Sequence, residues 1–372
     1  MKYYIVAGER SGDLHASNLI KALKKEDSQA QFRGFGGDYM QAQGTEIVVH
    51  IREMAFMGFW EVAKGFFKIM DVRKQCKKDI LANRPDVLIL VDYGGFNMRL
   101  AKWAKSKGIK VFYYISPKVW AWNTSRAWKL RKTVDEMFLI LPFEEEFFKK
   151  FDGWQTHYVG NPVVDAVQQF VPNPDFRRQN GLAGGQELIA LLPGSRKQEL
   201  RHILPTFVEV AQKNPDKQFV IAAVKSLDAS LYAPALAVSN ISLVYDQTYD
   251  LYQQASAAIV TSGTATLETG LFELPQVVAY RSSSLSYRIA KWVAKVDYIS
   301  LVNLIADKEV VKELIQDDMS AENLNRELHQ LLDRSGNRRK EMIREYKQMK
   351  EKLGNDSASA RAAKKMTSLL HK

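Results

Sequence analysis

One stretch decides the fold of this chain, and it reads Val87-Leu88-Ile89-Leu90-Val91-Asp92-Tyr93-Gly94-Gly95-Phe96-Asn97. Five apolar residues in a row, without polar alternation, predict a strand that is buried on both faces. The two glycines that follow predict a turn. Similar apolar runs lie at residues 3–7, 110–115 and 136–141. Short buried strands that alternate with helices predict a parallel sheet with helices on its faces.

The second half of the chain repeats this pattern. Its strand-like runs lie at residues 188–192, 219–223, 257–260 and 276–279. Between the two halves, the prolines and glycines of residues 166–186 predict a linker. We therefore expect an α/β fold with two Rossmann-like domains that face a cleft, over residues 1–165 and 187–345, with C-terminal helices. The terminal helix, in residues 346–372, is expected to return towards the first domain.

Composition limits the classes of protein that remain. Of the 372 residues, 46% are hydrophobic and 26% are charged, as in ordinary globular proteins. Cys76 is the only cysteine, which excludes an internal disulfide framework and a thiolate zinc cluster and favours a reducing cytoplasm. No apolar run approaches the roughly 20 residues that a membrane-spanning helix needs. We therefore expect a cytoplasmic protein that does not span a membrane.

The charge of the chain is uneven. The formal net charge is +11, and ten lysines and arginines but no acidic residue lie between Tyr93 and Val134. A strongly basic surface favours a polyanionic partner, which is nucleic acid, anionic lipid or a phosphorylated substrate. A merely solvated basic surface is the alternative.

Two loops in the second half have the composition of phosphate-binding turns. The first reads Leu192-Pro193-Gly194-Ser195-Arg196 and leads from a strand into a helix. Its glycine admits a close ligand, the helix start offers free N–H groups, and Arg196 can bind two phosphate oxygens at once. In the second loop, Ser262-Gly263-Thr264 precedes Glu268, whose carboxylate can accept both hydroxyls of a ribose. An ordinary strand-to-helix turn is the alternative for each loop.

The first half offers a candidate general base. Asp92 stands at the end of a buried parallel strand, where a carboxylate can take a proton from an attacking hydroxyl. An aspartate that caps the following helix is the alternative. The glycine-rich stretch Gly8-Glu9-Arg10-Ser11-Gly12-Asp13 matches neither the Walker loop nor the dinucleotide fingerprint, which disfavours ATP and NAD.

Residues 54–70 are unusually rich in large apolar side chains with basic residues at their edge. Met57, Phe59, Trp60, Phe66, Phe67 and Met70 are the candidate contacts to membrane or acyl chains. Too many large groups occur here for one buried stripe, as in a helix that lies in a membrane interface. A helix buried on both sides within the domain is the alternative.

Taken together, these motifs resemble one family along nearly the whole chain. The lipid-A-disaccharide synthases have similar motifs in the same order and spacing as the following residues: Ala7 to Asp13, Met57-Gly58, Asp92 with Phe96-Asn97, Ser116-Pro117, Val119 to Trp122, Leu141 to Glu144, Val159-Gly160, Leu192 to Arg196, Ser262 to Glu268, Tyr280-Arg281, Asp297 to Leu301 with Asn303, and Lys312 to Gln316.

The resemblance implies a GT-B fold and an inverting transfer without a metal or other cofactor. A 2,3-diacylglucosamine unit would pass from UDP to the 6-hydroxyl of 2,3-diacylglucosamine 1-phosphate (lipid X), giving a β-1,6 disaccharide 1-phosphate and UDP. Asp92 corresponds to the family's proposed base. The substrate-binding residues would be Glu9, Ser11, Ser195, Arg196, Ser262, Gly263, Thr264, Glu268, Asn303 and Gln316. The N-terminal domain would bind the acceptor and the C-terminal domain the UDP donor.

The resemblance also implies peripheral contact with the inner face of an anionic inner membrane, which suits residues 54–70, and it leaves the oligomeric state open. Two positions depart from the family, because Gly95 and Asn161 stand where it often has an acid and a histidine. A UDP-N-acetylglucosamine 2-epimerase or another GT-B transferase is the rival within the fold. An RNA-binding protein that uses the basic, aromatic residues 99–132 is the rival of another class, but no known RNA module is present. We therefore expect no nucleic-acid partner.

Overall fold

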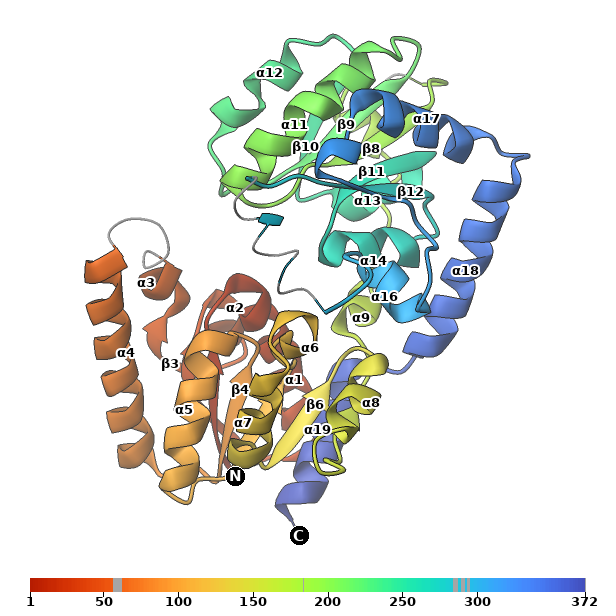
Figure 1. Ribbon diagram of the computed structural model, residues 1–372. Coiled ribbons are helices and arrows are strands. Elements are labelled where there is room, and N and C mark those ends of the chain that lie inside the picture. Colours follow the sequence, from red (N-terminus) through yellow and green to blue (C-terminus); the bar gives the residue numbers. More distant parts are fainter. Residues whose placement is uncertain (56–61, 183, 284–286, 289–291, 293–294, 372) are drawn as a thin grey trace. The chain divides into compact units, whose positions relative to one another are not determined.

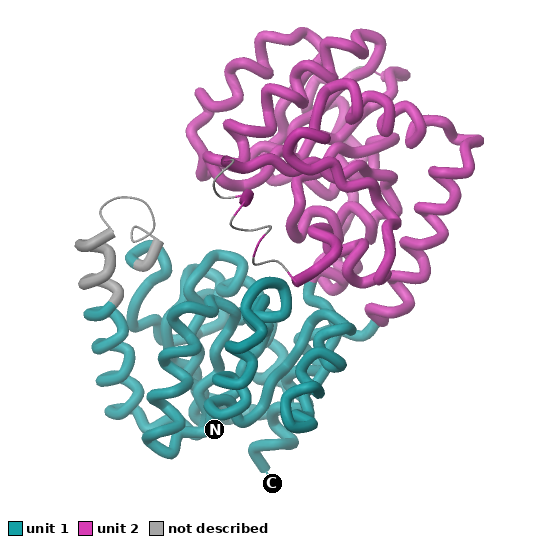
Figure 2. Tube along the Cα trace, in the orientation of Figure 1, with its two compact units in different colours: residues 1–162, 355–372 teal, residues 163–354 magenta. Residues whose placement is uncertain are grey.

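A computed structural model describes residues 1–55, 62–182, 184–283, 287–288, 292 and 295–371 of the chain. The described residues form two compact units (Figure 2). Unit 1 comprises Met1–Pro162 together with Asn355–Lys372, and unit 2 comprises Val163–Gly354. The chain therefore passes between the units twice.

Unit 1 is built on a parallel sheet of seven strands in the order β3-β2-β1-β4-β5-β6-β7 (Figure 1). The strands are β1 (Lys2–Ala7), β2 (Gln31–Gly36), β3 (Glu46–His50), β4 (Val87–Val91), β5 (Val111–Tyr114), β6 (Glu136–Leu139) and β7 (His157–Tyr158). The helices are α1 (Arg10–Glu26), α2 (Asp38–Ala42), α3 (Ile51–Ala55), α4 (Val62–Asn83), α5 (Gly94–Ser106), α6 (Val119–Trp122), α7 (Ser125–Thr133), α8 (Phe143–Lys149) and α19 (Ala358–Leu370).

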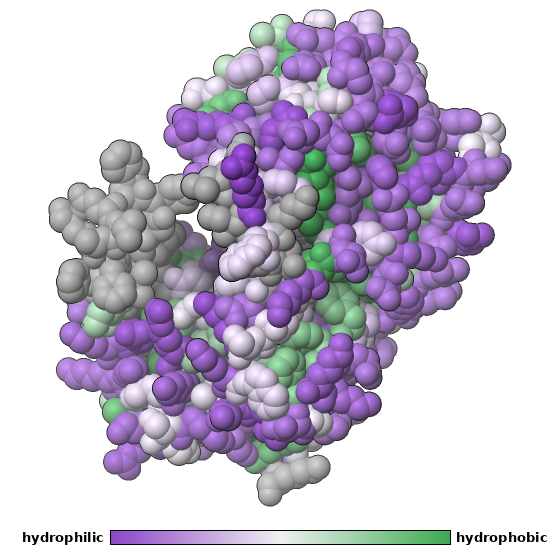
Figure 3. Space-filling view, in the orientation of Figure 1, coloured by the Kyte–Doolittle hydropathy of each residue, from purple (hydrophilic) through white to green (hydrophobic). Residues whose placement is uncertain are grey.

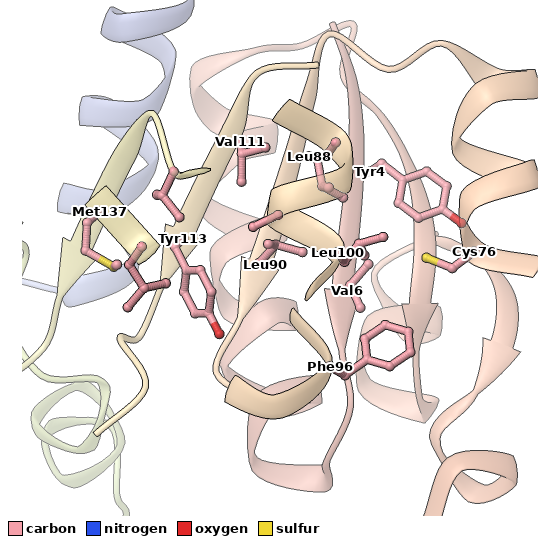
Figure 4. Packing of buried hydrophobic residues seen from close by; sticks show 14 of the residues in the cluster. Tyr4, Val6, Cys76, Leu88, Leu90, Phe96, Leu100, Val111, Tyr113 and Met137 are labelled. Carbon is pink, nitrogen blue, oxygen red and sulfur yellow. The ribbon is translucent and has the colours of Figure 1, made fainter. Parts of the chain in front are cut away.

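Both faces of this sheet are buried. Successive strand residues point to opposite sides, and the apolar residues on each side pack under helices. Figure 4 shows one face, where Tyr4 and Val6 of β1 lie with Leu88 and Leu90 of β4 under Leu100 of α5. The residues between them, such as Tyr3, Ile5 and Ile89, pack on the other face against α1 and α19. The continuous apolar strands of the sequence are therefore explained by two cores, one on each side of the sheet.

Unit 2 has a parallel sheet of six strands in the order β10-β9-β8-β11-β12-β13. Its strands are β8 (Leu188–Leu192), β9 (Gln218–Ala223), β10 (Ile241–Tyr245), β11 (Ala257–Thr261), β12 (Gln276–Tyr280) and β13 (Glu313–Ile315). Its helices are α9 (Pro162–Gln168), α10 (Phe176–Gln179), α11 (Lys197–Gln212), α12 (Ala233–Leu236), α13 (Thr248–Gln254), α14 (Thr264–Leu271), α16 (Leu301–Ala306), α17 (Ala321–Leu332) and α18 (Asn337–Leu353), with short 3-10 turns at Ala229–Tyr232 and Gln316–Asp318. Helix α9 begins at the last residue of unit 1.

Residues 166–186, expected to be a linker, lie in unit 2. Phe176 and Leu182 are buried in the core beside β8, and the backbone N–H of Asn173 donates to Asp250 at 2.6 Å. The prolines and glycines did indicate irregular backbone, but the apolar residues between them fix it to the sheet. The two units instead join at Pro162–Val163 and at Gly354–Asn355.

The C-terminal helices divide between the units. Helix α18 keeps Met342, Tyr346, Met349 and Leu353 buried at helical spacing, while hydrophilic residues cover its outer side (Figure 3). Gly354, with φ of 77°, ends α18, and α19 then packs on α1 in unit 1. Among the described helices, none is long and apolar enough to cross a membrane.

Candidate active site

Each sheet contains one point where the strand order reverses. In unit 1, the chain runs outward from β1 through β2 to β3 and then crosses back to β4 on the other side of β1. In unit 2, it runs from β8 through β9 to β10 and then crosses back to β11. Ligands of open parallel sheets bind at such switch points, beyond the carboxyl ends of the strands. The loops there hold most of the predicted site residues.

At the switch point of unit 1, the backbone turns sharply at Asp92 and Tyr93. Their φ angles are 46° and 49°, a left-handed conformation that is unusual for residues other than glycine. The carbonyl of Asp92 accepts hydrogen bonds from the Asn97 side chain at 2.8 Å and from the Tyr113 hydroxyl at 2.7 Å. Both donors are buried in unit 1, so they can hold this strained turn in place.

Gly8 makes this turn sterically feasible. A Cβ atom on Gly8 would lie 2.2 Å from the ring of Tyr93. No larger residue fits there without displacing the ring. The loop after β1 and the loop after β4 therefore pack directly on each other, as the pairing of β1 with β4 requires.

Burial raises the pKa of the Asp92 carboxyl, and the negative charge of Glu9 raises it further. The positive charge of Lys118 acts in the opposite direction and lowers this pKa. Asp92 is thus a carboxylate whose proton affinity is increased, as suits a general base. Glu9 and Ser11, at the exposed start of α1, lie on the loop that packs against it.

Asp13, in the same glycine-rich stretch, has a structural role. Its buried carboxylate accepts hydrogen bonds from the backbone N–H groups of Gly37, Tyr39 and Met40 at 2.7, 3.0 and 3.1 Å. These bonds cap the start of α2. Asp13 therefore fixes the loop after β2.

A buried carboxylate that the sequence did not single out supports the loop after β5. Glu144 accepts hydrogen bonds from the hydroxyl of Ser116, from the indole Nε1 of Trp120 at 3.0 Å and from the backbone N–H of Leu141 at 3.0 Å. Burial raises the pKa of Glu144, while these hydrogen bonds lower it. Its presence in the Leu-Pro-Phe-Glu motif was visible in the sequence, but its partners were not.

This network holds the chain on either side of Lys118, which lies between Ser116 and Trp120. Ile115, which directly precedes Ser116, has a φ of 65°, and this value is an outlier for a β-branched residue. Glu144 holds the chain on both sides of the lysine whose charge acts on Asp92. We therefore regard Glu144 as a positioning residue.

In unit 2, the loop after β8 differs from what the sequence predicted. The helix start was expected to offer free N–H groups, but Glu199 accepts hydrogen bonds from the backbone N–H of Ser195 at 3.0 Å and of Arg196 at 3.2 Å. Its other oxygen accepts a bond from the Arg196 guanidinium at 3.2 Å. The carboxylate reaches this position because Gly194, with φ of 102°, has no side chain in its way. An acid of α11 thus occupies donors that were expected to be open.

The loop after β11 leaves an open space. Gly263 has φ of 155° and ψ of −160°, a conformation essentially restricted to glycine, and no atom lies within 4 Å of the place of a Cβ. The Ser262 hydroxyl donates to the carbonyl of Ile299 at 2.7 Å, and Thr264, the first residue of α14, is exposed. This loop is shaped for close approach of a ligand to the backbone.

Glu268, one turn into α14, has a partner that sequence reasoning missed. The hydroxyl of Tyr249 donates to its Oε1 atom at 3.0 Å. Burial raises the pKa of Glu268, and the hydrogen bond from Tyr249 lowers it. The bond fixes the carboxylate and leaves its second oxygen to accept other donors.

Asn303 and Gln316 do not have the open amides expected of substrate ligands. The buried Asn303 donates to the Val311 carbonyl and to Glu313, both at 2.9 Å, and accepts from the N–H groups of Val310 and Val311. All four of its hydrogen bonds are thus made inside unit 2. Gln316 pairs through both amide atoms with the backbone of Ser282. Both residues shape the loops next to β13.

Glu313 connects these residues to the loop after β11. It accepts hydrogen bonds from the backbone N–H groups of Ile299 and Ser300, each at 2.9 Å, and from the side chain of Asn303. The Ile299 carbonyl in turn accepts the bond from Ser262. Glu313 and Ser262 therefore hold residues 299–300 beside the glycine turn.

The structure says less about the predicted membrane contacts and about the two positions that depart from the family. Met57, Phe59 and Trp60 lie outside the described residues, as do the side chains of Phe66 and Phe67, and Met70 is half-buried on α4. Gly95 has open space where the family often has an acid. Asn161 is buried and donates to the Ile140 carbonyl at 3.1 Å.

The family model described as lipid-A-disaccharide synthetase matches residues 3–366. The chain belongs to this family. It is 40% identical to the lipid-A-disaccharide synthase of Geobacter metallireducens, covering 96% of the chain and 94% of that protein. It is 38% identical to that of Myxococcus xanthus, covering 98% and 97%. The predicted resemblance is thus confirmed, and the chain is an enzyme of the glycosyltransferase class.

Solved structures with low sequence identity share the fold. The UDP-N-acetylglucosamine 2-epimerase of Neisseria meningitidis, bound to UDP-N-acetylglucosamine, matches with a TM-score of 0.69 and 14% identity over 99% of this chain and 100% of its own. The calicheamicin glycosyltransferase CalG4 matches with a TM-score of 0.63 and 14% identity over 100% and 98%. These likenesses confirm the predicted GT-B class of fold.

Proposed function

We propose that this chain transfers a 2,3-diacylglucosamine unit from UDP to the 6-hydroxyl of 2,3-diacylglucosamine 1-phosphate. The observation that carries the proposal is the family match over nearly the whole chain, with Asp92 held at the switch point of unit 1. The products would be a β-1,6-linked disaccharide 1-phosphate and UDP. Unit 1 would bind the acceptor and unit 2 the nucleotide.

In the reaction, the Asp92 carboxylate takes the proton of the acceptor hydroxyl as its oxygen attacks the anomeric carbon of the donor. The bond from that carbon to the diphosphate breaks, and UDP leaves with the negative charge. Attack on the face opposite the leaving group inverts the anomeric centre. The increased proton affinity that burial and Glu9 give to Asp92 supports this role.

The leaving diphosphate would be stabilised by the loop after β8 in unit 2. Arg196 is 77% exposed, so its guanidinium is accessible to phosphate oxygens. The positive end of the α11 dipole lies at the same place. We propose that the diphosphate replaces Glu199 as the partner of Arg196.

The nucleotide would be held by the loop after β11 and by Glu268. Ser262, Gly263 and Thr264 surround the open glycine turn, and the free oxygen of Glu268 can accept a ribose hydroxyl. We propose Asn303 and Gln316 as positioning residues, since their amides are already bonded within the unit.

The test is a reaction of the purified protein with UDP-2,3-diacylglucosamine and 2,3-diacylglucosamine 1-phosphate, with and without a chelator. We expect equal formation of disaccharide and UDP in both samples. Absence of the disaccharide would contradict the proposal, and a strict requirement for a divalent metal would contradict the metal-independent scheme. Conversion of UDP-N-acetylglucosamine to its 2-epimer would instead favour the rival activity.

We further propose that the protein binds peripherally to the inner face of an anionic inner membrane through residues 54–70. Replacing Phe66, Phe67 and Met70 by Ser should reduce sedimentation with anionic vesicles without unfolding the protein. If these side chains belonged to the core, each truncated aromatic would destabilise the fold by about 3 to 5 kcal/mol, and the variant would not fold. Wild-type protein that ignores anionic vesicles at low salt would also contradict the proposal.

A further inference from the structure

Helix α19 forms one wall of a cavity at the edge of the unit 1 sheet. The cavity has a volume of about 460 Å³. Its lining comes from Glu145 of α8, from the edge strand β7 with its neighbours Thr156 and Val159, and from α19. Figure 1 shows α19 next to α8, and both contribute to the lining. A cavity of this size can hold a small ligand.

The wall formed by α19 is positively charged. Helix α19 contains no acidic residue, and one side of it packs in the core through Ala358, Ala362, Ala363 and Met366. The lining residues Arg361, Lys364, Lys365 and Ser368 follow at spacings of three, four and seven, so they share the other side. The helix therefore presents three cations to one cavity.

These cations have little compensation. Among the described residues that line the cavity, Glu145 is the only acid, and its Oε1 atom already accepts a hydrogen bond from the backbone N–H of Tyr158 at 2.9 Å. Within the part of the chain that the structure describes, neither Lys364 nor Lys365 has an ion-pair partner. Cations three and four residues apart on a helix repel each other. An anion in the cavity would offset this repulsion.

Arg361 is held in place before any ligand arrives. Its guanidinium donates to the Tyr158 carbonyl at 3.2 Å and lies 5.8 Å from the centre of the Tyr158 ring. Burial raises the pKa of Tyr158 to about 12, so this phenol stays neutral at physiological pH. A fixed guanidinium beside two exposed ammonium groups suits a ligand with several negatively charged oxygens.

We infer that this cavity is an anion site for phosphate groups, in which Arg361, Lys364 and Lys365 bind the oxygens. The phosphate could come from a free species such as pyrophosphate or from the headgroup of an anionic lipid. The site goes beyond the proposed transfer reaction, since none of its residues belongs to the nucleotide loops or to the loop of Asp92.

The first test is a calorimetric titration of the full-length protein with inorganic pyrophosphate, with UDP in excess to occupy the nucleotide loops. The variant Lys364→Gln/Lys365→Gln loses two charge-assisted contacts, so its affinity should fall about tenfold or more. The control Lys21→Gln/Lys25→Gln removes the same charge from exposed positions on α1 of the same unit. We expect the control to bind like the wild type. Equal weakening in both variants, or none in either, would overturn the site.

The second test identifies the source of the phosphate. Both double variants are sedimented with vesicles of phosphatidylglycerol and phosphatidylcholine, and with vesicles of phosphatidylcholine alone. Specific loss of binding to the anionic vesicles by Lys364→Gln/Lys365→Gln would assign the site to a lipid headgroup. Unchanged sedimentation together with the loss of pyrophosphate affinity would assign it to a free phosphate species. No difference between the variants in either test would exclude both sources and overturn the inference.

Discussion

The loops at the two switch points differ in which residues adopt a positive φ angle. In the loop after β4 of unit 1, the left-handed residues are Asp92 and Tyr93, whereas in the loops after β8 and β11 of unit 2 they are Gly194 and Gly263. A non-glycine residue in this region costs about 1 to 3 kcal/mol, which a glycine avoids. Unit 1 bears that cost and thereby presents a side chain at the turn. Unit 2 presents backbone and leaves space.

The polar groups follow the same division. Among the described residues, the Asp92 carboxylate forms no ion pair, and the backbone carbonyl of Asp92 accepts hydrogen bonds from Asn97 and Tyr113. In unit 2, the carboxylates of Glu199 and Glu313 are bonded to backbone N–H groups of the loops themselves. In unit 1 the carboxylate is thus available to react, whereas in unit 2 the carboxylates hold the binding loops rigid.

The largest effect should come from removing the reactive group of unit 1. Asp92→Asn leaves the shape of the turn but cannot accept the proton, so turnover should fall roughly 10²- to 10⁴-fold. The affinity for UDP, measured by calorimetry, should stay unchanged, because the nucleotide loops belong to unit 2. The control Asp86→Asn changes an exposed aspartate at the other end of β4 and should retain activity. Loss of UDP affinity with normal turnover would reverse the assignment of the two units.

Removing the exposed cation of unit 2 should weaken both binding and rate. Arg196→Ala loses a charge-assisted contact that strengthens as the diphosphate leaves, so donor affinity and turnover should each fall about tenfold or more. Arg326→Ala is the matched control. Arg326 is also exposed, and its guanidinium also donates to a side chain three positions away, that of Asn323. A normal rate for Arg196→Ala would make this arginine a surface residue.

Glu268 tests whether a fixed carboxylate of unit 2 binds ribose. Glu268→Gln should raise the Kd for UDP by about tenfold, because hydrogen bonds to a charged acceptor contribute about 1.5 to 3 kcal/mol. Tyr249→Phe removes the bond that orients the carboxylate and should have a smaller effect in the same direction. Glu209→Gln, at an exposed position near the end of α11, should have none. Equal Kd values for all four proteins would remove Glu268 from the nucleotide site.

The smallest effect concerns the pH dependence of turnover. Asp92 must be ionised to accept a proton, and its pKa is raised by burial and by Glu9, so turnover should fall on the acid side at a pH above the ordinary aspartate value of 3.8. Lys118→Met removes the cation that lowers this pKa and should move the acid limb to higher pH. Glu9→Gln should move it to lower pH. Acid limbs that coincide in all three proteins would show that another group controls the rate.

The sequence predicted the parts of this structure that depend on local pattern. Uninterrupted apolar runs such as 87–91 identified the parallel strands, and the residues that follow them identified the loops at both switch points. The segment 166–186 was misjudged because turn residues dominate its composition, although Phe176 and Leu182 anchor it in the core. Apolar residues in a proline-rich segment give no periodic signal.

The site was harder to predict than the fold, because a polar side chain looks the same in sequence whether it binds a ligand or its own backbone. Asn303 sits in a motif of the family, yet all its hydrogen bonds are internal. The partners of Glu199 depend on the geometry of the adjacent turn, and Glu144 accepts from Ser116, which is distant in the sequence. Gly94 and Gly95 predicted a turn here, but nothing in the sequence showed that Asp92 and Tyr93 themselves take the left-handed conformation.

The placement of α19 in unit 1 has a consequence for protein synthesis. Ala362, Ala363 and Met366 of α19 belong to the same core as Leu19 and Ile20 of α1, so this core is incomplete until α19 has left the ribosome. The whole of unit 2 is translated in the meantime, which takes of the order of ten seconds or more at about 5–20 residues per second. Unit 2 can therefore fold first, although it comes second in the chain. During that interval the nascent N-terminal unit exposes an apolar face of the kind that chaperones bind.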